Sequence, residues 1–217
     1  GQISNFQKEK YFNVELDCDG IPAVKPKIFD PDEAEQLRSR CHGNEAIVTA
    51  VKETEKKVKA PKLYDLTTLQ REANRIYGMT AKQTLDTAQS LYEKKLITYP
   101  RTDSQYLTED MEQTARNVVR QIYEKYQLTG PFDQPEQPDV KKVMNNSKVT
   151  DHHAIIPTME LASSHLDELK SWEEKILFLI AVHTVMAMSK DHIYQETEIE
   201  VECQGEIFKA KDRKSVV

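Results

Sequence analysis

Alternating apolar and polar side chains at both ends of the chain predict β-strands. Residues 12–18 place an apolar side chain at every second position, which is typical of a strand with one buried face. Residues 45–58 favour a second strand with a charged outer end. Near the other end, four glutamates in residues 196–203 alternate with less polar side chains. The Gln204-Gly205 pair then predicts a turn into a partner strand over residues 206–210.

A first helix is predicted from its start signal. Asp30 is a typical capping residue, Pro31 suits the first helical position, and two acids follow in the first turn. Gly43 is expected to end this helix, because glycine adopts the left-handed conformation common after helix ends.

Two closely spaced helices are predicted in the middle of the chain. Thr67 with Gln70 forms a capping-box pattern, and Gly78 ends the apolar stripe that follows. Thr80 with Gln83 repeats the pattern a few residues later. Two capped helices joined by a tight glycine turn are typical of a helix-turn-helix, although an ordinary helical hairpin fits the same pattern.

The remaining helical segments are separated by a long irregular stretch. A helix is predicted over residues 109–127 with Thr108 as its cap, and a proline-rich surface loop over residues 131–148. A last helix is predicted to begin at Ser171, which forms a capping-box pattern with Glu174.

The body of that last helix, residues 176–188, is apolar nearly all round. We therefore expect it to be buried between layers of the protein, since it is too short to span a bilayer. His183 in its middle is expected to be a packed side chain and not a catalytic one.

These patterns predict an α+β protein with two domains. Both chain ends are β-rich, the middle is helical, and Ala60-Pro61 has the composition of a boundary. We predict one discontinuous β-rich domain from residues 1–60 and 189–217. A mostly helical domain, residues 61–188, is inserted into it.

Composition narrows the class of protein. The chain has 217 residues, of which 38% are hydrophobic and 30% charged, and this balance is typical of a globular protein. Its net charge of −6 argues against a non-specific nucleic-acid binder, but a local basic groove remains compatible with it. No signal peptide or membrane-length apolar run is present, which favours the cytoplasm. Cys18, Cys41 and Cys203 are widely spaced and favour free thiols over a disulfide frame or a zinc site.

Tyr99-Pro100-Arg101 carries the most distinctive candidate chemistry. Pro100 disfavours a helix at Tyr99, and in an extended segment Tyr99 and Arg101 would point the same way. The pKa of a free phenol is about 10, and a guanidinium nearby favours the phenolate and can hold a phosphate through two hydrogen bonds. Tyr92 ends an apolar helical stripe, so we expect it to be largely buried. A plain β-turn with a packed tyrosine fits the same residues.

Four segments in a fixed order identify a family resemblance. Residues 96–104 resemble the active-site tyrosine segment of the type IA DNA topoisomerases, particularly their bacterial topoisomerase III members. Residues 67–73 and 89–93 resemble the family's segments upstream of the tyrosine. Residues 151–158, which begin Asp151-His152-His153, resemble its downstream histidine motif.

The resemblance implies a reaction and roles for particular residues. The family cleaves single-stranded DNA by transesterification, without ATP, and keeps the 5′ phosphoryl group on the tyrosine while another strand passes. By matching position, Tyr99 is the nucleophile and Arg101 holds the scissile phosphate, with Asp103 fixing the guanidinium. His152 is expected to contact a DNA phosphate. Thr102 and Ser104 could donate to phosphate or simply shape the turn. Lys94 and Lys95 are further candidates for phosphate contact, because they add positive charge near Tyr99.

The resemblance also implies parts that this sequence does not offer. The family takes its Mg²⁺ site and a catalytic lysine from a Toprim domain, and closes its ring with an arch domain. We therefore interpret the chain as an excised gate sheet domain plus tyrosine domain, inactive alone and without a metal of its own. Adjacent residues on a strand face opposite ways, so His152 and His153 are not expected to form a metal pair, and the role of His153 stays open.

Two other functions remain as alternatives. The first is a non-enzymatic DNA-binding module that uses the helix-turn-helix, and the second is a structural interaction domain with an accidental tyrosine motif. Neither requires a tyrosine, an arginine and a histidine together, and this conjunction favours an isomerase.

Overall fold

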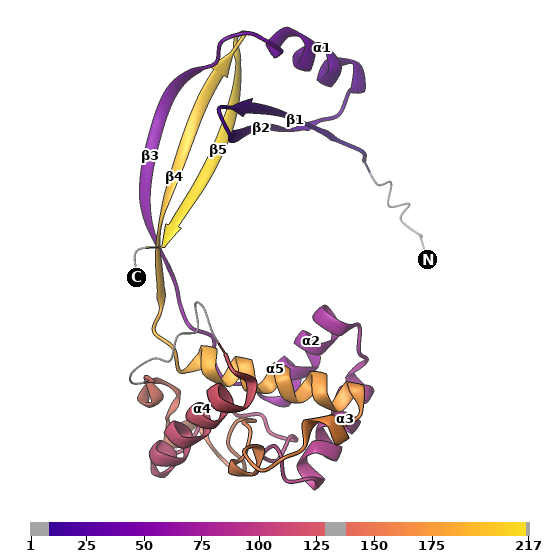
Figure 1. Ribbon diagram of the computed structural model, residues 1–217, viewed down its shortest axis with the longest axis vertical. Helices are drawn as coiled ribbons and strands as arrows, with labels where there is room; N and C mark the ends of the chain where they lie inside the picture. The colour runs from indigo at the N-terminus through magenta and orange to yellow at the C-terminus, as the bar shows by residue number, and fades with distance from the viewer. Residues whose placement is uncertain (1–8, 129–137, 216–217) are drawn as a thin grey trace. The chain divides into compact units, whose positions relative to one another are not determined.

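The computed structural model describes residues 9–128 and 138–215, and these form two compact units. One unit contains the chain up to Val58 and again from His192, and we call it the sheet unit. The other, Lys59–Asp191, is the helical unit. Figure 1 shows that every long strand belongs to the first and helices α2–α5 to the second. The boundaries expected from sequence were at residues 60 and 188.

A single antiparallel sheet forms the sheet unit. Its strand order is β1-β2-β5-β4-β3, so the two ends of the chain meet in its middle. The strands are β1 (Phe12–Cys18), β2 (Ile21–Ile28), β3 (Ile47–Val58), β4 (His192–Cys203) and β5 (Glu206–Ser215). The strands predicted at residues 12–18, 45–58, 196–203 and 206–210 are thus confirmed, the last two as parts of longer strands.

The sequence patterns gave no sign of strand β2, which contains Pro22 and Pro26. Proline cannot donate a ladder hydrogen bond and normally speaks against a central strand. Here β2 pairs along its length with β1, but its registered contact with β5 is only at Val24 and Lys209. The short ladder on that side leaves room for residues without an N–H group.

Helix α1 (Pro31–Cys41) covers the core of the sheet unit. The Asp30 side chain accepts a hydrogen bond of 2.9 Å from the backbone N–H of Asp32, which confirms the predicted cap. Its apolar face buries Ala34, Leu37 and Cys41 in the same core as Val201 and Phe208, and the helix contacts mainly β1 and β2.

Strand β3 lies at the edge of the sheet and pairs with β4 from Ile47–Glu202 to Val58–His192. All of its side chains except Thr54 are exposed. On β4 the predicted glutamate face is not uniformly solvated, because Glu196 is buried. Its carboxylate lies 3.7 Å from Lys211 Nζ and 3.6 Å from Arg213 Nε on β5, which compensate the buried charge.

Among the described residues of the helical unit, four α-helices pack around one hydrophobic core. Helix α5 contacts all three others and runs between them (Figure 1). The helices are α2 (Leu66–Tyr77), α3 (Ala81–Glu93), α4 (Glu112–Tyr126) and α5 (Ser171–Ala187). Five single-turn 3₁₀ helices lie at Glu109–Met111, Val140–Val143, Asn146–Lys148, Met159–Leu161 and Leu166–Glu168.

Only residues 138–148 of the predicted surface loop 131–148 can be compared with the structure, since residues 131–137 lie outside the described residues. From Val140 onward the chain forms 3₁₀ turns, and Val140 and Val143 are buried in the core. That part of the prediction was wrong. Prolines and asparagines are typical of surface loops, but the two valines near them pack into the core.

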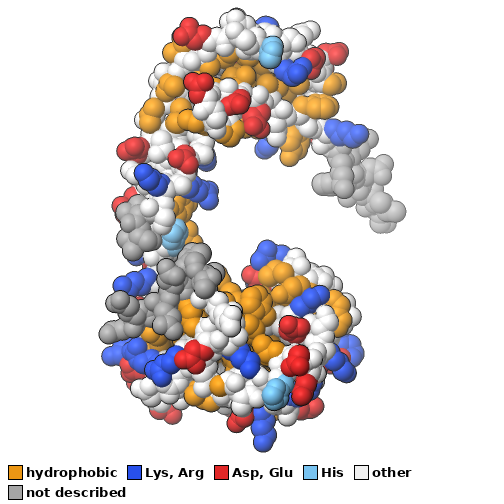
Figure 2. All heavy atoms as spheres, in the orientation of Figure 1, with side chains coloured by type: hydrophobic (Ala, Val, Ile, Leu, Met, Phe, Trp, Pro, Cys, Tyr) orange, Lys and Arg blue, Asp and Glu red, His pale blue; other side chains and the backbone are white. Residues whose placement is uncertain are grey.

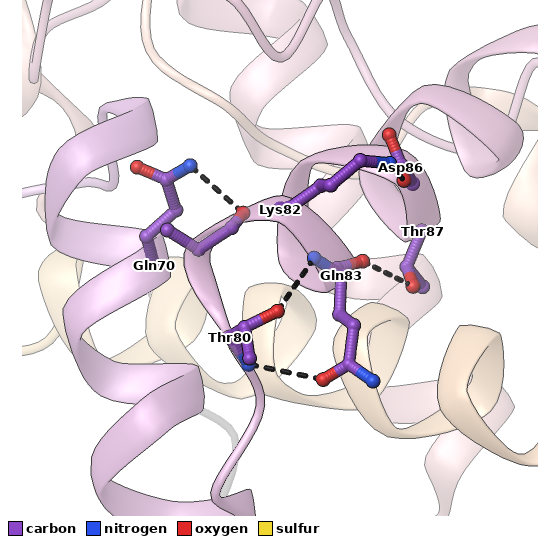
Figure 3. Close-up of polar contacts among 7 residues, drawn as sticks. Gln70, Thr80, Lys82, Gln83, Asp86 and Thr87 are labelled. Carbon is purple, nitrogen blue, oxygen red and sulfur yellow. Dashed lines mark hydrogen bonds and ion pairs between the residues drawn. The ribbon is translucent and has the colours of Figure 1, made fainter.

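Of the two capping boxes predicted for α2 and α3, the second is confirmed and the first is wrong. Thr80 Oγ1 accepts from the N–H of Gln83 at 3.1 Å, and the Gln83 side chain accepts from the N–H of Thr80 at 3.0 Å (Figure 3). Helix α2, however, begins at Leu66 and is capped by Asp65 with Thr68. The Thr67 box was therefore wrong, because Asp65 lies two residues earlier and caps equally well.

The caps of the other two helices also differ from expectation. The Thr108 side chain makes no capping hydrogen bond, although its backbone carbonyl accepts one from the N–H of Met111 at 3.0 Å. Helix α5 is capped at Lys170, whose backbone N–H donates to Glu173 Oε1 at 3.2 Å, so the Ser171 box was wrong. The body of α5 is not buried all round, since Phe178 is 41% exposed. None of the described helices is both long and apolar enough to cross a membrane.

Candidate active site

The segment before Tyr99 is fixed by the end of helix α3 and by a second chain segment. Lys95 adopts a left-handed conformation with φ 64° and turns the chain away from the helix. The backbone N–H of Thr98 then donates to the carbonyl of Ile156 at 3.0 Å, and Thr98 Oγ1 accepts from the N–H of Ile156 at 3.1 Å. These bonds place residues 96–99 beside residues 154–158, which are far away in sequence.

After Tyr99 the chain bends at Pro100 and Arg101 and does not continue as an extended strand. The expectation that Tyr99 and Arg101 share one side by simple alternation therefore does not apply. Pro100 is buried, whereas Tyr99 is half-buried and Arg101 is exposed. The bend leaves the guanidinium free to reach a ligand beside the tyrosine.

Tyr99 lies in a cluster of three rings. The His152 ring is tilted against it with centroids 4.3 Å apart, and the Tyr92 ring meets it edge-on at 5.3 Å. His152 is exposed, so its ring nitrogens are open to a ligand. The tyrosine segment and the histidine motif, which are about fifty residues apart, thus meet at one place.

Tyr92 was expected to be largely buried, and this was wrong. Its side chain is 39% exposed, because α3 ends at the next residue and the ring leans over the surface toward Tyr99. Tyr92 was not among the predicted site residues. Tyr92 continues the buried stripe of α3 two helical turns beyond Thr84. This pattern gave no indication that the helix ends at the next residue.

Thr102 and Ser104, candidates for phosphate contact, are both buried. Thr102 Oγ1 donates to the carbonyl of His152 at 2.9 Å and accepts from the N–H of Ser104 at 3.1 Å. Ser104 Oγ donates to the carbonyl of Lys148 at 2.8 Å. Both hydroxyls are used inside the protein, so we assign them to shaping the turn and to holding the His152 backbone.

Arg101 and Asp103 were expected to form a pair that fixes the guanidinium. Both are exposed, and within residues 9–128 and 138–215 no ion pair joins them. Thr102, whose buried hydroxyl is bonded within the protein, anchors the chain between the two charges. The role of Asp103 in fixing the guanidinium stays a prediction.

Lys94 is also engaged within the protein. Its Nζ lies 2.8 Å from a carboxylate oxygen of Glu173 on α5, and Ser90 Oγ donates to the same carboxylate at 2.9 Å. Burial by itself would raise the pKa of Glu173, but the bonds from Lys94, Ser90 and the Lys170 backbone hold that pKa below its usual value. Lys94 thus anchors the end of α3, while Lys95 keeps an exposed side chain.

His153 and His183 differ in their surroundings. His153 Nδ1 lies 2.7 Å from the carbonyl of Ala154. His183 stacks on the Tyr64 ring with centroids 3.7 Å apart, and its Nε2 lies 2.7 Å from the Lys62 carbonyl. Burial lowers the pKa of His183, as expected for a packed, neutral histidine.

Figure 2 shows basic and acidic side chains interspersed over the visible face of each unit. Within the described part of the chain, no group of three or more His, Cys, Asp or Glu side chains is placed to hold a metal ion. The chemistry that the site offers is therefore a phenol, a free guanidinium and an exposed imidazole.

Comparison with known proteins places this geometry in context. A family model described as "DNA topoisomerase" matches residues 1–217. DNA topoisomerase 3 of Bacillus licheniformis is 35% identical over 97% of this chain, and that of Staphylococcus epidermidis is 36% identical over 97%. The chain spans about 30% of the length of these relatives. The solved structure of full-length topoisomerase I from Thermotoga maritima matches 95% of this chain and 34% of its own, with a TM-score of 0.67 at 27% identity.

Proposed function

Because the chain belongs to the type IA DNA topoisomerase family, we propose that it supplies the nucleophile with which such an enzyme cleaves and reseals single-stranded DNA. The observation that supports this most is the meeting of Tyr99 with His152, beside an exposed Arg101 that is free of internal ion pairs among the described residues. A phenol beside an imidazole, with an exposed arginine two residues further along the chain, suits attack on a phosphodiester.

In the proposed reaction, Tyr99 Oη attacks the phosphorus and the 3′ oxygen of the DNA leaves. The 5′ phosphoryl group stays on the tyrosine until the 3′ hydroxyl attacks it in reverse. Arg101 binds the non-bridging oxygens, which gain charge in the transition state, and two parallel N–H bonds suit this task. His152 contacts a neighbouring phosphate and keeps the strand next to the Tyr99 ring.

The resemblance implies Mg²⁺ in the whole enzyme, but the residues described here do not fit a magnesium site. The described acids form no cluster of three, and Glu173 and Glu196 are already compensated by Lys94 and by Lys211 with Arg213. We derive no step through the metal. We propose that this chain alone neither cleaves nor relaxes DNA and depends on a Toprim domain for magnesium.

A helix-turn-helix role for α2 and α3 is a second proposal, with less support than the cleavage reaction. The Thr80–Gln83 box and Gly78 produce the tight turn that such a motif needs (Figure 3). An ordinary helical hairpin has the same geometry, and α3 leads directly into the Tyr99 segment. We therefore assign α3 to positioning the nucleophile.

The test is covalent trapping of a labelled oligonucleotide by the full-length protein that carries this chain, with magnesium present. Tyr99→Phe should fold and bind single-stranded DNA, with a stability change of about 1 kcal/mol, yet form no adduct on a denaturing gel. Tyr92→Phe and Tyr106→Phe are matched controls and should both keep the adduct. An adduct formed by the Tyr99 variant would refute the proposal.

A further inference from the structure

A small pocket in the helical unit lies apart from the three-ring cluster. Its volume is about 180 Å³, and it is lined by Lys59 and Lys62 before α2, Gln105 and Tyr106 after the Tyr99 turn, Lys142, and Asp191. We call it the Tyr106 pocket. None of the residues that line it belongs to the site proposed for cleavage.

The lining of the Tyr106 pocket is positively charged in a chain whose net charge is −6. It contains three lysines and one acid, Asp191, whose carboxylate accepts a hydrogen bond of 2.9 Å from the Ala60 backbone. Lys142 Nζ donates to the Ser189 carbonyl, so its charge is held at the wall of the pocket. A fourth cation, Lys148 Nζ, lies 5.4 Å from the centre of the Tyr106 ring.

Tyr106 is half-buried, and hydrogen bonds on both sides fix its backbone. Its backbone N–H donates to Ser104 Oγ at 3.2 Å, and its carbonyl accepts from the N–H of Ala154 at 2.9 Å. Lys62 Nζ lies 5.9 Å from the centre of the ring. Lys62 and Lys148 have exposed, flexible side chains and can move from the ring to a bound anion.

A fixed aromatic face surrounded by ammonium groups suits a ligand that combines a flat ring with phosphates. Nucleobases stack on tyrosine whatever their sequence, and lysines bind the neighbouring phosphates. The charge and the ring alone do not distinguish a free nucleotide from a single-stranded polynucleotide. The choice of a polynucleotide over a free nucleotide rests on the proposed function alone.

We propose that the Tyr106 pocket is a second binding site for single-stranded nucleic acid, in which one base stacks on Tyr106 and flanking phosphates bind Lys62, Lys142 and Lys148. The site takes a stretch of strand other than the one that reacts with Tyr99. It adds affinity without taking part in the chemistry.

The test uses this chain and a short labelled oligo-dT, with binding followed by fluorescence anisotropy over a range of salt. Tyr106→Ala should weaken binding about 5- to 150-fold, as expected for one lost base stack, whereas Tyr106→Phe should bind as wild type. Lys62→Gln should reduce the slope of log K against log salt by about 0.7, the value for one phosphate contact to a single strand.

Lys82→Gln is the matched control, because Lys82 is 85% exposed and pairs with Asp86 on the surface of α3 (Figure 3). It should change neither the affinity nor the slope. Equal effects of Lys62→Gln and Lys82→Gln, or unchanged binding by Tyr106→Ala, would overturn the site. A mononucleotide that binds as tightly as oligo-dT would overturn the polynucleotide assignment.

Photocrosslinking separates this proposal from the cleavage reaction. Oligo-dT that carries 5-iododeoxyuridine should give a crosslinked peptide containing Tyr106, and this crosslink should survive in Tyr99→Phe. If Tyr99→Phe still forms the covalent adduct while Tyr106 crosslinks, only the proposed cleavage role fails. If the adduct depends on Tyr99 but no crosslink maps to Tyr106, only the pocket fails.

Discussion

Replacing Glu173 by glutamine should loosen the helical unit at the point where α3 and α5 meet. Glu173 is 3% exposed and accepts bonds from Lys94, Ser90 and the Lys170 backbone. Glutamine keeps the shape but loses the charge, and one of its oxygens becomes an NH₂ group that faces other donors. The variant therefore leaves at least one donor without an acceptor.

The size of the effect follows from the exposure of the partner. Breaking a fully buried ion pair costs about 3–5 kcal/mol, but the Lys94 side chain is 42% exposed and can regain water. We expect a loss of about 1–3 kcal/mol, the range for a buried hydrogen-bonding group left unpaired. At about 2–4 °C per kcal/mol, the melting temperature should fall by roughly 2–12 °C.

The effect should depend on pH in a defined direction. The folded pKa of Glu173 is below its unfolded value, so its carboxylate stabilises the fold fully above the unfolded pKa of about 4.3. This stabilisation is lost as the pH falls through the lower folded pKa. The difference in unfolding free energy between wild type and Glu173→Gln should therefore be constant near neutrality and shrink in strong acid.

The assay is thermal and urea unfolding of both proteins across that pH range. Glu174→Gln is the matched control, since it makes the same change at an exposed neighbour on the same helix. A double-mutant cycle with Lys94→Met measures the pair itself. Equal stability of the Glu173 and Glu174 variants, or a difference that grows in acid, would refute the reasoning.

Two further predictions concern the site and the entry to α2. In the full-length protein, Arg101→Lys should lose most of the covalent adduct despite its kept charge, because lysine lacks the two-pronged phosphate contact; an adduct at wild-type level on the denaturing gel would contradict this. Asp65→Ala should cost about 1 kcal/mol by removing the cap of α2, whereas Thr67→Ala should change stability little. Urea unfolding compares the stability of the two variants. A larger loss of stability in the Thr67 variant would mean that Thr67, and not Asp65, caps α2.

Local patterns predicted most elements, because their causes are local. Alternation located β1, β3 and β4, and the Thr80–Gln83 box and the Asp30 cap were confirmed by their hydrogen bonds. At the start of α2 the sequence pattern indicated Thr67 and overlooked Asp65, which caps the helix in the structure. Strand β2 was missed because its prolines are tolerated only through a short ladder with β5.

The sequence motifs singled out Tyr99 and His152, whose rings meet in the structure, but they did not give the geometry around them. The motifs directed attention to Tyr99, Arg101 and His152, whose catalytic roles stay predictions. No local pattern indicates that the Thr102 hydroxyl holds the His152 carbonyl, fifty positions away in sequence. The exposure of Tyr92 and the engagement of Lys94 by Glu173 likewise depend on packing between segments distant along the chain.

The pairing of β3 with β4 has a consequence for the order of folding. Val58 and His192 are partners in register, so the chain leaves the sheet and returns to it at adjacent positions after residues 59–191. Closing a flexible loop of roughly 130 residues costs about 3 kcal/mol more than closing a four-residue turn. A helical unit that folds first makes that loop compact before β3 meets β4. The sheet should therefore form late, and a short turn substituted for residues 59–191 should let it form faster.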